Sequence, residues 1–343
     1  MAWTRYCYSE VLPFAALFTV ECTNVGLNTL FKAATLRGLS YHVFMVYSFA
    51  LSTLVLTPFA FLFHRKSKLP PCNLPFVFSI IILGILGFTA QMLGFKGIEY
   101  ATPTLSSAMN NLTPACTFAL ALIFRMEKLS FRRLSSQAKI IGTIISISGA
   151  FVVILYKGPT LIKTVTPSNL LDEPSSSTQS NWIIGGGLFA AQAFLCSIWY
   201  ILQARAVKQY PAELIVVVLY NLSLTVVSTP VCFFAERNLN AWKINSKIGL
   251  ITILYSGIIG SGLGTAVIIW GINLKGPVYA ALFKPWSIAI AAIMGVIFLG
   301  DTFYCGSLVG SIVIAIGYYI VIWGNTREDT RQELEEHREP LLQ

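Results

Sequence analysis

Long apolar segments alternate with short polar connections along most of the chain. A helix needs roughly 20 apolar residues to cross the hydrocarbon core of a bilayer. Ten segments meet this requirement, at about 11–31, 42–63, 76–97, 104–124, 140–156, 182–203, 214–235, 248–270, 278–299 and 306–323. The pattern predicts an all-α membrane protein with ten transmembrane helices.

The two halves of the chain repeat one another in order. The run Leu17-Phe18-Thr19-Val20-Glu21 matches Leu188-Phe189-Ala190-Ala191-Gln192. At later positions Lys32 falls on Gln203, Pro114 on Pro285, and the pair Gly142 and Gly149 on Gly310 and Gly317. Repeated membrane helices are typical of transporters whose halves move around a site between them.

A polar stretch at 157–181 separates five helices from five. Because five is odd, the second half enters the membrane from the opposite side, which makes the repeats inverted. We therefore expect a first five-helix repeat at 1–156, an extracytosolic linker at 157–181, a second repeat at 182–324, and a cytoplasmic tail at 325–343. The tail is acidic and polar, which favours a solvated helix or a disordered end.

Composition supports a membrane protein, since 55% of the residues are hydrophobic and only 11% are charged. The net charge of +9 comes from residues in short connections, where basic side chains orient helices, and we expect no nucleic-acid partner. With both termini in the cytoplasm, more of these basic residues lie inside than outside. The 7 cysteines are odd in number and show no ligand spacing, so we expect no disulfide framework, no metal and no cofactor.

The first apolar segment carries Glu21, Asn24, Asn28 and Lys32 at spacings of three or four residues, which places them on one helix face. A charged group at mid-helix costs roughly 3 kcal/mol in a bilayer, so this face turns towards the interior. Glu21 is either a site for a substrate ammonium or a proton, or a structural carboxylate satisfied by Asn24 or a neighbouring helix. Its repeat counterpart is the neutral Gln192.

A second polar group lies in the ninth segment, where Lys284 precedes Pro285 and Trp286. Its ammonium either meets a substrate carboxylate, pairs with Glu21 across the cavity, or snorkels to a helix end. In the fourth segment, Asn110 and Asn111 precede Pro114 at an equivalent depth. Proline opens local backbone, so we expect these two elements to form related halves of a solute site.

Three more polar residues are candidates for the same chamber: Gln91, Tyr200 and Asn221. Each is alternatively a hydrogen bond that holds two helices together. The run from Gly257 to Thr265 repeats small residues, which favours tight helix packing and, as an alternative, a flexible cavity wall.

The chain resembles a known family through an ordered series of motifs. They are Glu21-Cys-Thr-Asn-Val-Gly-Leu-Asn28 followed by Lys32, Asn111-Leu-Thr-Pro114, Arg125-Met-Glu127-Lys128, Ala138-Lys139-Ile-Ile-Gly142, Gly149-Ala150, Tyr156-Lys157-Gly158-Pro159, Lys275-Gly276-Pro277 and Tyr318-Tyr319-Ile-Val-Ile-Trp323-Gly324. Together they look like the plant EamA-type drug/metabolite transporters, in the Walls-Are-Thin-related branch, also called usually-multiple-acids-move-in-and-out transporters. The resemblance covers the chain to about residue 325. It implies ten helices in two inverted repeats and transport of small organic solutes, with amino acids for members like this one and auxin for the founding branch.

The sequence therefore favours a facilitator of amino acids that works by alternating access, with an auxin or indole-type solute as the rival. A nucleotide-sugar antiporter fits less well, because a multiply charged anion calls for several deep cations and Lys284 is the sole one. An enzyme is disfavoured because no nucleophile with its base, aspartate pair or metal ligand set assembles. The expected partners are the solute and the lipid bilayer, with a homo-oligomer left open. The plasma membrane is the expected location and the vacuolar membrane the alternative.

Overall fold

The computed structural model describes residues 11–338 except for a set of segments and single positions. Those outside it are 65–72, 102, 125–133, 157, 163–178, 211, 245, 282, 285–286, 288–289, 292–293 and 295–302. Trp286, residues 163–178 of the expected linker and residues 339–343 of the expected tail therefore lie outside the described part of the chain.

Helices account for most of the described residues. In the first half they are α2 Leu12–Thr35, α3 Tyr41–His64, α4 Leu74–Tyr100, α5 Pro103–Asn110, α6 Leu112–Ile123 and α7 Leu134–Leu155. In the second half they are α8 Gln179–Gln209, α9 Glu213–Ala235, the short 3₁₀ helix η2 Leu239–Trp242, α10 Lys247–Tyr255, the π-helix η3 Ser256–Gly264, α11 Thr265–Lys275, α12 Pro277–Ala281 and α14 Cys305–Arg338. Two short strands, β1 Thr160–Ile162 and β2 Phe303–Tyr304, pair antiparallel.

In the described part of the chain, five continuous helical stretches are long and apolar enough to cross a membrane. They are Tyr41–Phe63, Leu74–Tyr100, Asn181–Gln209, Glu213–Ala235 and Lys247–Lys275. Large apolar side chains such as Leu54, Phe61 and Phe63 are exposed on the outside of these helices, where contact with lipid is more favourable than contact with water. The prediction of a helical membrane protein is confirmed. The α14 helix continues to Arg338, so the described part of the tail takes the helical alternative.

The fourth apolar segment is broken into α5 and α6 at Asn111. Pro114 lies just beyond this break, and a proline has no N–H to offer the carbonyl four residues earlier. The ninth segment is interrupted in the same way after α12. There the Lys284 N–H donates to the Ala281 carbonyl at 3.2 Å, and the Ser287 N–H donates to the Lys284 carbonyl at 3.1 Å. Two helices thus turn irregular near their middle, as the proline elements predict.

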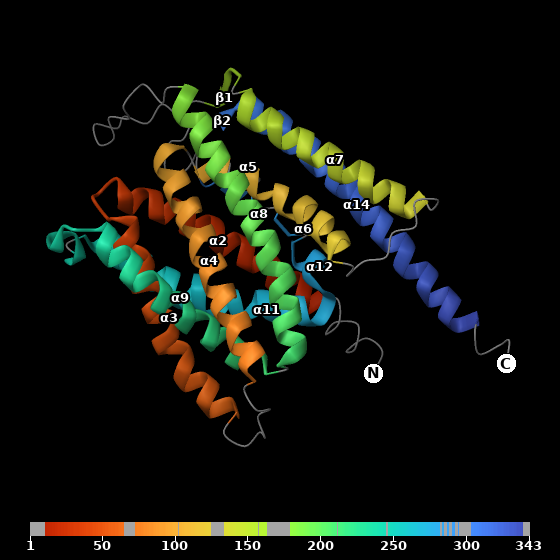
Figure 1. Cartoon of the computed structure of the whole chain (residues 1–343). Coiled ribbons are helices and arrows are strands. Elements are labelled where there is room, and N and C mark those ends of the chain that lie inside the picture. The colour runs from red at the N-terminus through yellow and green to blue at the C-terminus, as the bar shows by residue number, and fades with distance from the viewer. Residues whose placement is uncertain are drawn as a thin grey trace.

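Helices α7 and α14 form a long pair along one side of the bundle (Figure 1). The β1–β2 pairing joins the end of α7 to the start of α14, so the two helices are antiparallel. Their backbones approach closely at glycines: a Cβ on Gly142 would lie 2.3 Å from the Gly317 carbonyl oxygen, and one on Gly149 would lie 2.9 Å from that of Gly310. Since Gly142 matches Gly310 and Gly149 matches Gly317, the contacts are reciprocal.

The same reciprocity relates the first and third helices of each half. In Figure 1, α4 runs beside α8, and Gly97 of α4 leaves room for Phe189 of α8. In the other half, Gly271 of α11 leaves room for Leu17 of α2, and Leu17 matches Leu188, the residue before Phe189. Contacts that exchange in this way are the property of two units related by a two-fold axis.

Candidate functional site

A cavity of about 200 Å³ lies between the two halves of the chain. At roughly 30 Å³ per water molecule this is room for about seven waters, or for one small organic solute. Of the residues predicted from the sequence, those that line it are Glu21, Asn24, Asn28, Gln91, Asn110, Gln192, Tyr200 and Lys284. They come from α2, α4, α5 and α8 and from the broken ninth segment, so both repeats contribute.

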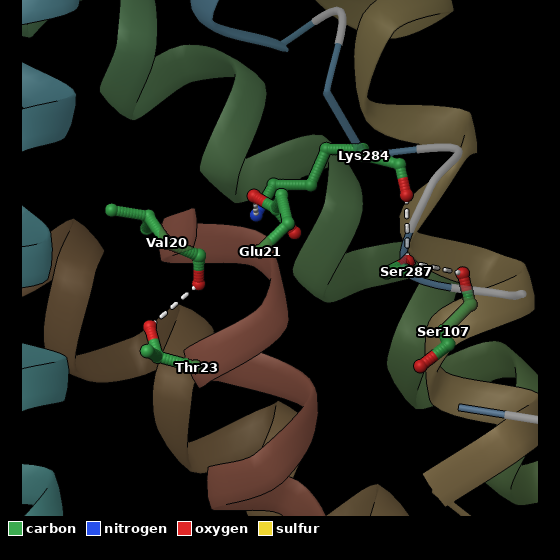
Figure 2. A network of polar contacts seen from close by, with 6 residues as sticks. All are labelled: Val20, Glu21, Thr23, Ser107, Lys284 and Ser287. Atoms are coloured by element: carbon green, nitrogen blue, oxygen red, sulfur yellow. Dashed lines mark hydrogen bonds and ion pairs between the residues drawn. The ribbon is translucent and has the colours of Figure 1, made fainter. Parts of the chain in front are cut away.

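An ion pair between Glu21 and Lys284 crosses this cavity (Figure 2). The Lys284 Nζ lies 2.8 Å from Glu21 Oε1, and the two side chains are only 14% and 5% exposed, respectively. A charge buried in a membrane protein needs a partner, and each of these groups supplies it for the other. Of the three arrangements that the sequence left open for Lys284, the structure shows the ion pair with Glu21 across the cavity.

The broken ninth segment is held to α5 by Ser287 (Figure 2). Its hydroxyl lies 2.6 Å from the Lys284 carbonyl and 3.4 Å from the Ser107 carbonyl, and it donates to these oxygens. The contact fixes the turn that presents the Lys284 side chain to Glu21. Sequence reasoning missed both serines, although the position of Ser287 three residues after Lys284 and two after a proline was a usable signal.

Aromatic side chains form another part of the cavity wall. Trp199 lies with its ring centroid 5.4 Å from those of both Tyr200 and Tyr220, and Phe95 lines the cavity as well. Gly87 of α4 makes room for this wall, because a Cβ there would lie 2.1 Å from the Tyr220 hydroxyl oxygen. Trp199 and Phe95 were not predicted, since an aromatic residue in an apolar segment has no distinguishing pattern.

Three buried polar atoms of the cavity lining have no hydrogen-bond partner among the described residues. They are the Oε1 of Gln192, the hydroxyl of Ser107 and the Nε1 of Trp199. A buried polar atom without a partner costs about 1–3 kcal/mol, and a bound solute or water would recover that cost. The site is thus charged at one place, polar at a second and aromatic at a third.

Asn111 and Asn221 lie outside the cavity lining. Asn221 of α9 donates from Nδ2 to the carbonyls of Val217 at 3.0 Å and Ser261 at 3.2 Å, so it ties α9 to the π-helix η3. The wider turn of a π-helix supplies the Ser261 carbonyl, and the small residues Gly260 and Ser261 also line the cavity. Asn111 is buried at the α5–α6 break, and neither polar atom of its side chain has a partner in the described part of the chain.

Comparison with known proteins identifies the family. The EamA-like transporter family model matches this chain twice, at residues 14–155 and 183–323. The chain belongs to this family. Among its relatives in Arabidopsis thaliana, WAT1-related protein At5g40240 is 53% identical over 96% of this chain and 91% of its own length. WAT1-related protein At3g28050 is 50% identical over 94% of this chain and 88% of its own length.

A solved crystal structure shares the fold of this WAT1-related chain. It aligns with a TM-score of 0.58 at 14% identity and covers 89% of this chain and 98% of the other. The two family matches correspond to the two halves that build the cavity. This EamA-like protein is a membrane transporter of small solutes, and the resemblance noted in the sequence is confirmed.

Proposed function

We propose that this chain moves zwitterionic amino acids across the membrane by alternating access around the Glu21–Lys284 cavity. The observation that supports the proposal is one acid and one base, paired at 2.8 Å in a cavity between the two repeats. Among the described residues that line it, Lys284 is the single Lys or Arg and Glu21 the single acid. A solute with no net charge matches this balance.

The ion pair suggests how a zwitterion binds. The carboxylate of an amino acid would approach Lys284 Nζ and its ammonium would approach Glu21, so one ion pair is replaced by two. All four charges then keep a partner, which avoids the cost of an isolated charge in low dielectric. The side chain of the solute would lie towards Trp199 and Tyr220, where the cavity wall is aromatic.

Alternating access is supported by the reciprocal contacts between the halves. The antiparallel α7–α14 pair and its exchanged glycine contacts fit a two-fold axis in the membrane plane, and hence inverted repeats at 1–156 and 182–324. With the broken fourth and ninth segments counted as spans, the proposed total is ten, with the linker at 157–181 outside and the tail at 325–343 in the cytoplasm. The proposed location is the plasma membrane, with the vacuolar membrane as the alternative.

Counterflow in reconstituted vesicles tests this function. Vesicles loaded with an unlabelled neutral amino acid should accumulate the labelled one, while empty vesicles or vesicles without protein should not. Glu21→Gln should reduce the initial rate about 100-fold, since a charge-assisted hydrogen bond is worth up to about 3 kcal/mol. The matched control is Glu99→Gln, which makes the same change at the exposed end of α4, outside the cavity lining. Unchanged counterflow in the Glu21 variant would remove this carboxylate from the mechanism.

The aromatic wall supports an auxin-like solute as the second candidate. An indole acid has a carboxylate for Lys284 and a ring for Trp199 and Tyr200, but no ammonium for Glu21. Competition separates the two: inhibition of counterflow by neutral amino acids and not by indole-3-acetate supports the first proposal. The opposite order supports the second.

A further inference from the structure

The first helix of each repeat carries a polar residue just beyond the part that lines the cavity. On α2, Glu21, Asn24 and Asn28 line the cavity, and Lys32 follows one turn later. On α8, Gln192, Cys196 and Trp199 line the cavity, and Gln203 follows one turn later. The spacing of three or four residues keeps each series on one helix face. Because Lys32 matches Gln203 in the repeat, they lie at opposite ends of the bundle, Lys32 near Gly38 and Gln203 near Tyr210.

Lys32 links α2 to the end of α4. Its Nζ donates to the carbonyl of Ile98 at 3.0 Å and to the carbonyl of Ala101 at 3.3 Å. These oxygens belong to the last turn of α4 and the residue after it, where carbonyls have no partner within the helix and the helix dipole is negative. An ammonium is well suited to that position. The two hydrogen bonds form what we call the α2 end link.

The acceptors of this link have counterparts in the second repeat. The sequence from Gly97 to Pro103 matches that from Gly271 to Pro277, so Ile98 corresponds to Ile272 and Ala101 to Lys275. The match is also structural, because α4 and α11 both end just before a proline that opens the next helix. Helix α8 packs against α11, as α2 packs against α4. The equivalent of the α2 end link would therefore run from Gln203 to the carbonyls of Ile272 and Lys275.

That second link is not formed in this conformation. Gln203 is fully buried, and both its Oε1 and its Nε2 have no hydrogen-bond partner among the described residues. A buried amide without partners is unfavourable, and an apolar side chain of similar shape would avoid the cost. The cost would be recovered in a conformation where α8 and the end of α11 come into hydrogen-bond distance.

We propose that Gln203 is a positioning residue for transport: its amide donates to the carbonyls of Ile272 and Lys275 when the Tyr210 end of the bundle closes. Lys32 has the equivalent role at the Gly38 end, where its hydrogen bonds to the carbonyls of Ile98 and Ala101 are already formed. The inference rests on the proposed function, since it assigns the two conformations that alternating access requires. The neutral amide makes the weaker link and the ammonium the stronger one, so the carrier rests with its Gly38 end closed.

Cys196 offers a built-in reporter of which end is open. Its thiol lines the cavity, so a membrane-impermeant thiosulfonate reaches it only from the open end. The full-length protein is reconstituted in vesicles of known orientation, and modification of the peptide that contains Cys196 is read by mass spectrometry. The signal should disappear in Cys196→Ser.

Removing each link should shift access in opposite directions. Gln203→Leu should lower modification of Cys196 from the Gly38 side roughly threefold to tenfold, which corresponds to one or two interhelical hydrogen bonds. Lys32→Met should raise it by at least the same factor, because the ammonium makes the stronger link. Gln203→Leu should also slow counterflow while the thermal stability of the protein stays equal or rises, which a merely structural role of Gln203 does not produce.

Loss of stability in Gln203→Leu, or a shift in the same direction for both variants, would overturn the inference. Gln203→Met, an unbranched apolar replacement, serves if the leucine variant fails to fold, and the same outcomes apply to it. The labelling needs no solute. If the wild-type protein transports no amino acid but the two variants shift Cys196 labelling in opposite directions, only the proposed function is contradicted. If the wild-type protein shows normal counterflow but neither variant shifts the labelling, only the role of Gln203 is contradicted.

Discussion

Helices α2 and α8 occupy equivalent places in the two repeats but differ in charge. Glu21 of α2 and Gln192 of α8 both line the cavity, yet only Glu21 is an acid, and it pairs with Lys284. Two acids in matching positions would repel each other and leave one without a partner. Repeat symmetry therefore places the polar positions, whereas recognition of an asymmetric solute requires the halves to differ at those positions.

The largest effect is expected when the charged position on α2 is neutralised. Glu21→Gln leaves the Lys284 ammonium buried without a partner, and Lys284→Met leaves the Glu21 carboxylate in the same state. Each single change should lower the free energy of unfolding by about 3–5 kcal/mol. The double variant should recover most of that stability, because no isolated charge remains, but its counterflow should stay about 100-fold below wild type.

Thermal unfolding in detergent, followed by tryptophan fluorescence, measures the stabilities, and counterflow measures transport. The decisive observation is the double variant: stability and transport should separate there. If counterflow recovers together with stability, the ion pair is structural and the solute is bound elsewhere in the cavity.

Much of this site follows from helix periodicity alone. Glu21, Asn24 and Asn28 recur on one face of a single apolar helix, and a polar face within a membrane must turn inwards, so all three line the cavity as predicted from the sequence. The repeat then locates Gln192 on α8 without further information. The ten apolar segments also predict most of the helices, since length and hydropathy are local properties of the chain.

Other features of the site depend on which side chains meet across the bundle, and helix periodicity does not predict these contacts. The sequence left three arrangements open for Lys284, and only the packing of α2 against the ninth segment selects the pair with Glu21. Asn221 was a candidate for the cavity, but it bonds to the Ser261 carbonyl, because η3 forms a π-helix that presents this oxygen to α9. Glycine-rich segments allow such departures from α-helical geometry, but the sequence does not predict where they occur.

A smaller effect is expected when a second acid is placed on α8. Gln192→Glu puts a like charge near Glu21 in the same cavity and should reduce counterflow about tenfold, or roughly 1.4 kcal/mol. Combined with Glu21→Gln, it moves the carboxylate from one repeat to the other and should restore part of the activity lost in the single Glu21 variant. Gln209→Glu, at the exposed end of α8, makes the same chemical change away from the cavity and should leave counterflow unchanged.

If the relocated carboxylate restores nothing, the two sites are not equivalent in their reach to Lys284 and the solute. Positions 21 and 192 would then be equivalent in their place along the helix but not in the chemistry that they support.

The smallest effect separates two glycines that line the cavity, one from each half of the chain. A Cβ on Gly87 of α4 would lie 2.1 Å from the Tyr220 hydroxyl oxygen, while a Cβ on Gly260 of η3 would lie 3.1 Å from a methyl carbon of Leu27. Gly87→Ala should therefore push Tyr220 out of the aromatic wall and cost about 1–3 kcal/mol, whereas Gly260→Ala should cost less than about 1 kcal/mol, because a leucine methyl yields more easily than a tyrosine held among rings. Thermal unfolding gives the order directly. Equal losses, or a larger loss for Gly260→Ala, would mean that the wall on the Tyr220 side is not the more tightly packed of the two, and that the asymmetry between the repeats is confined to charge.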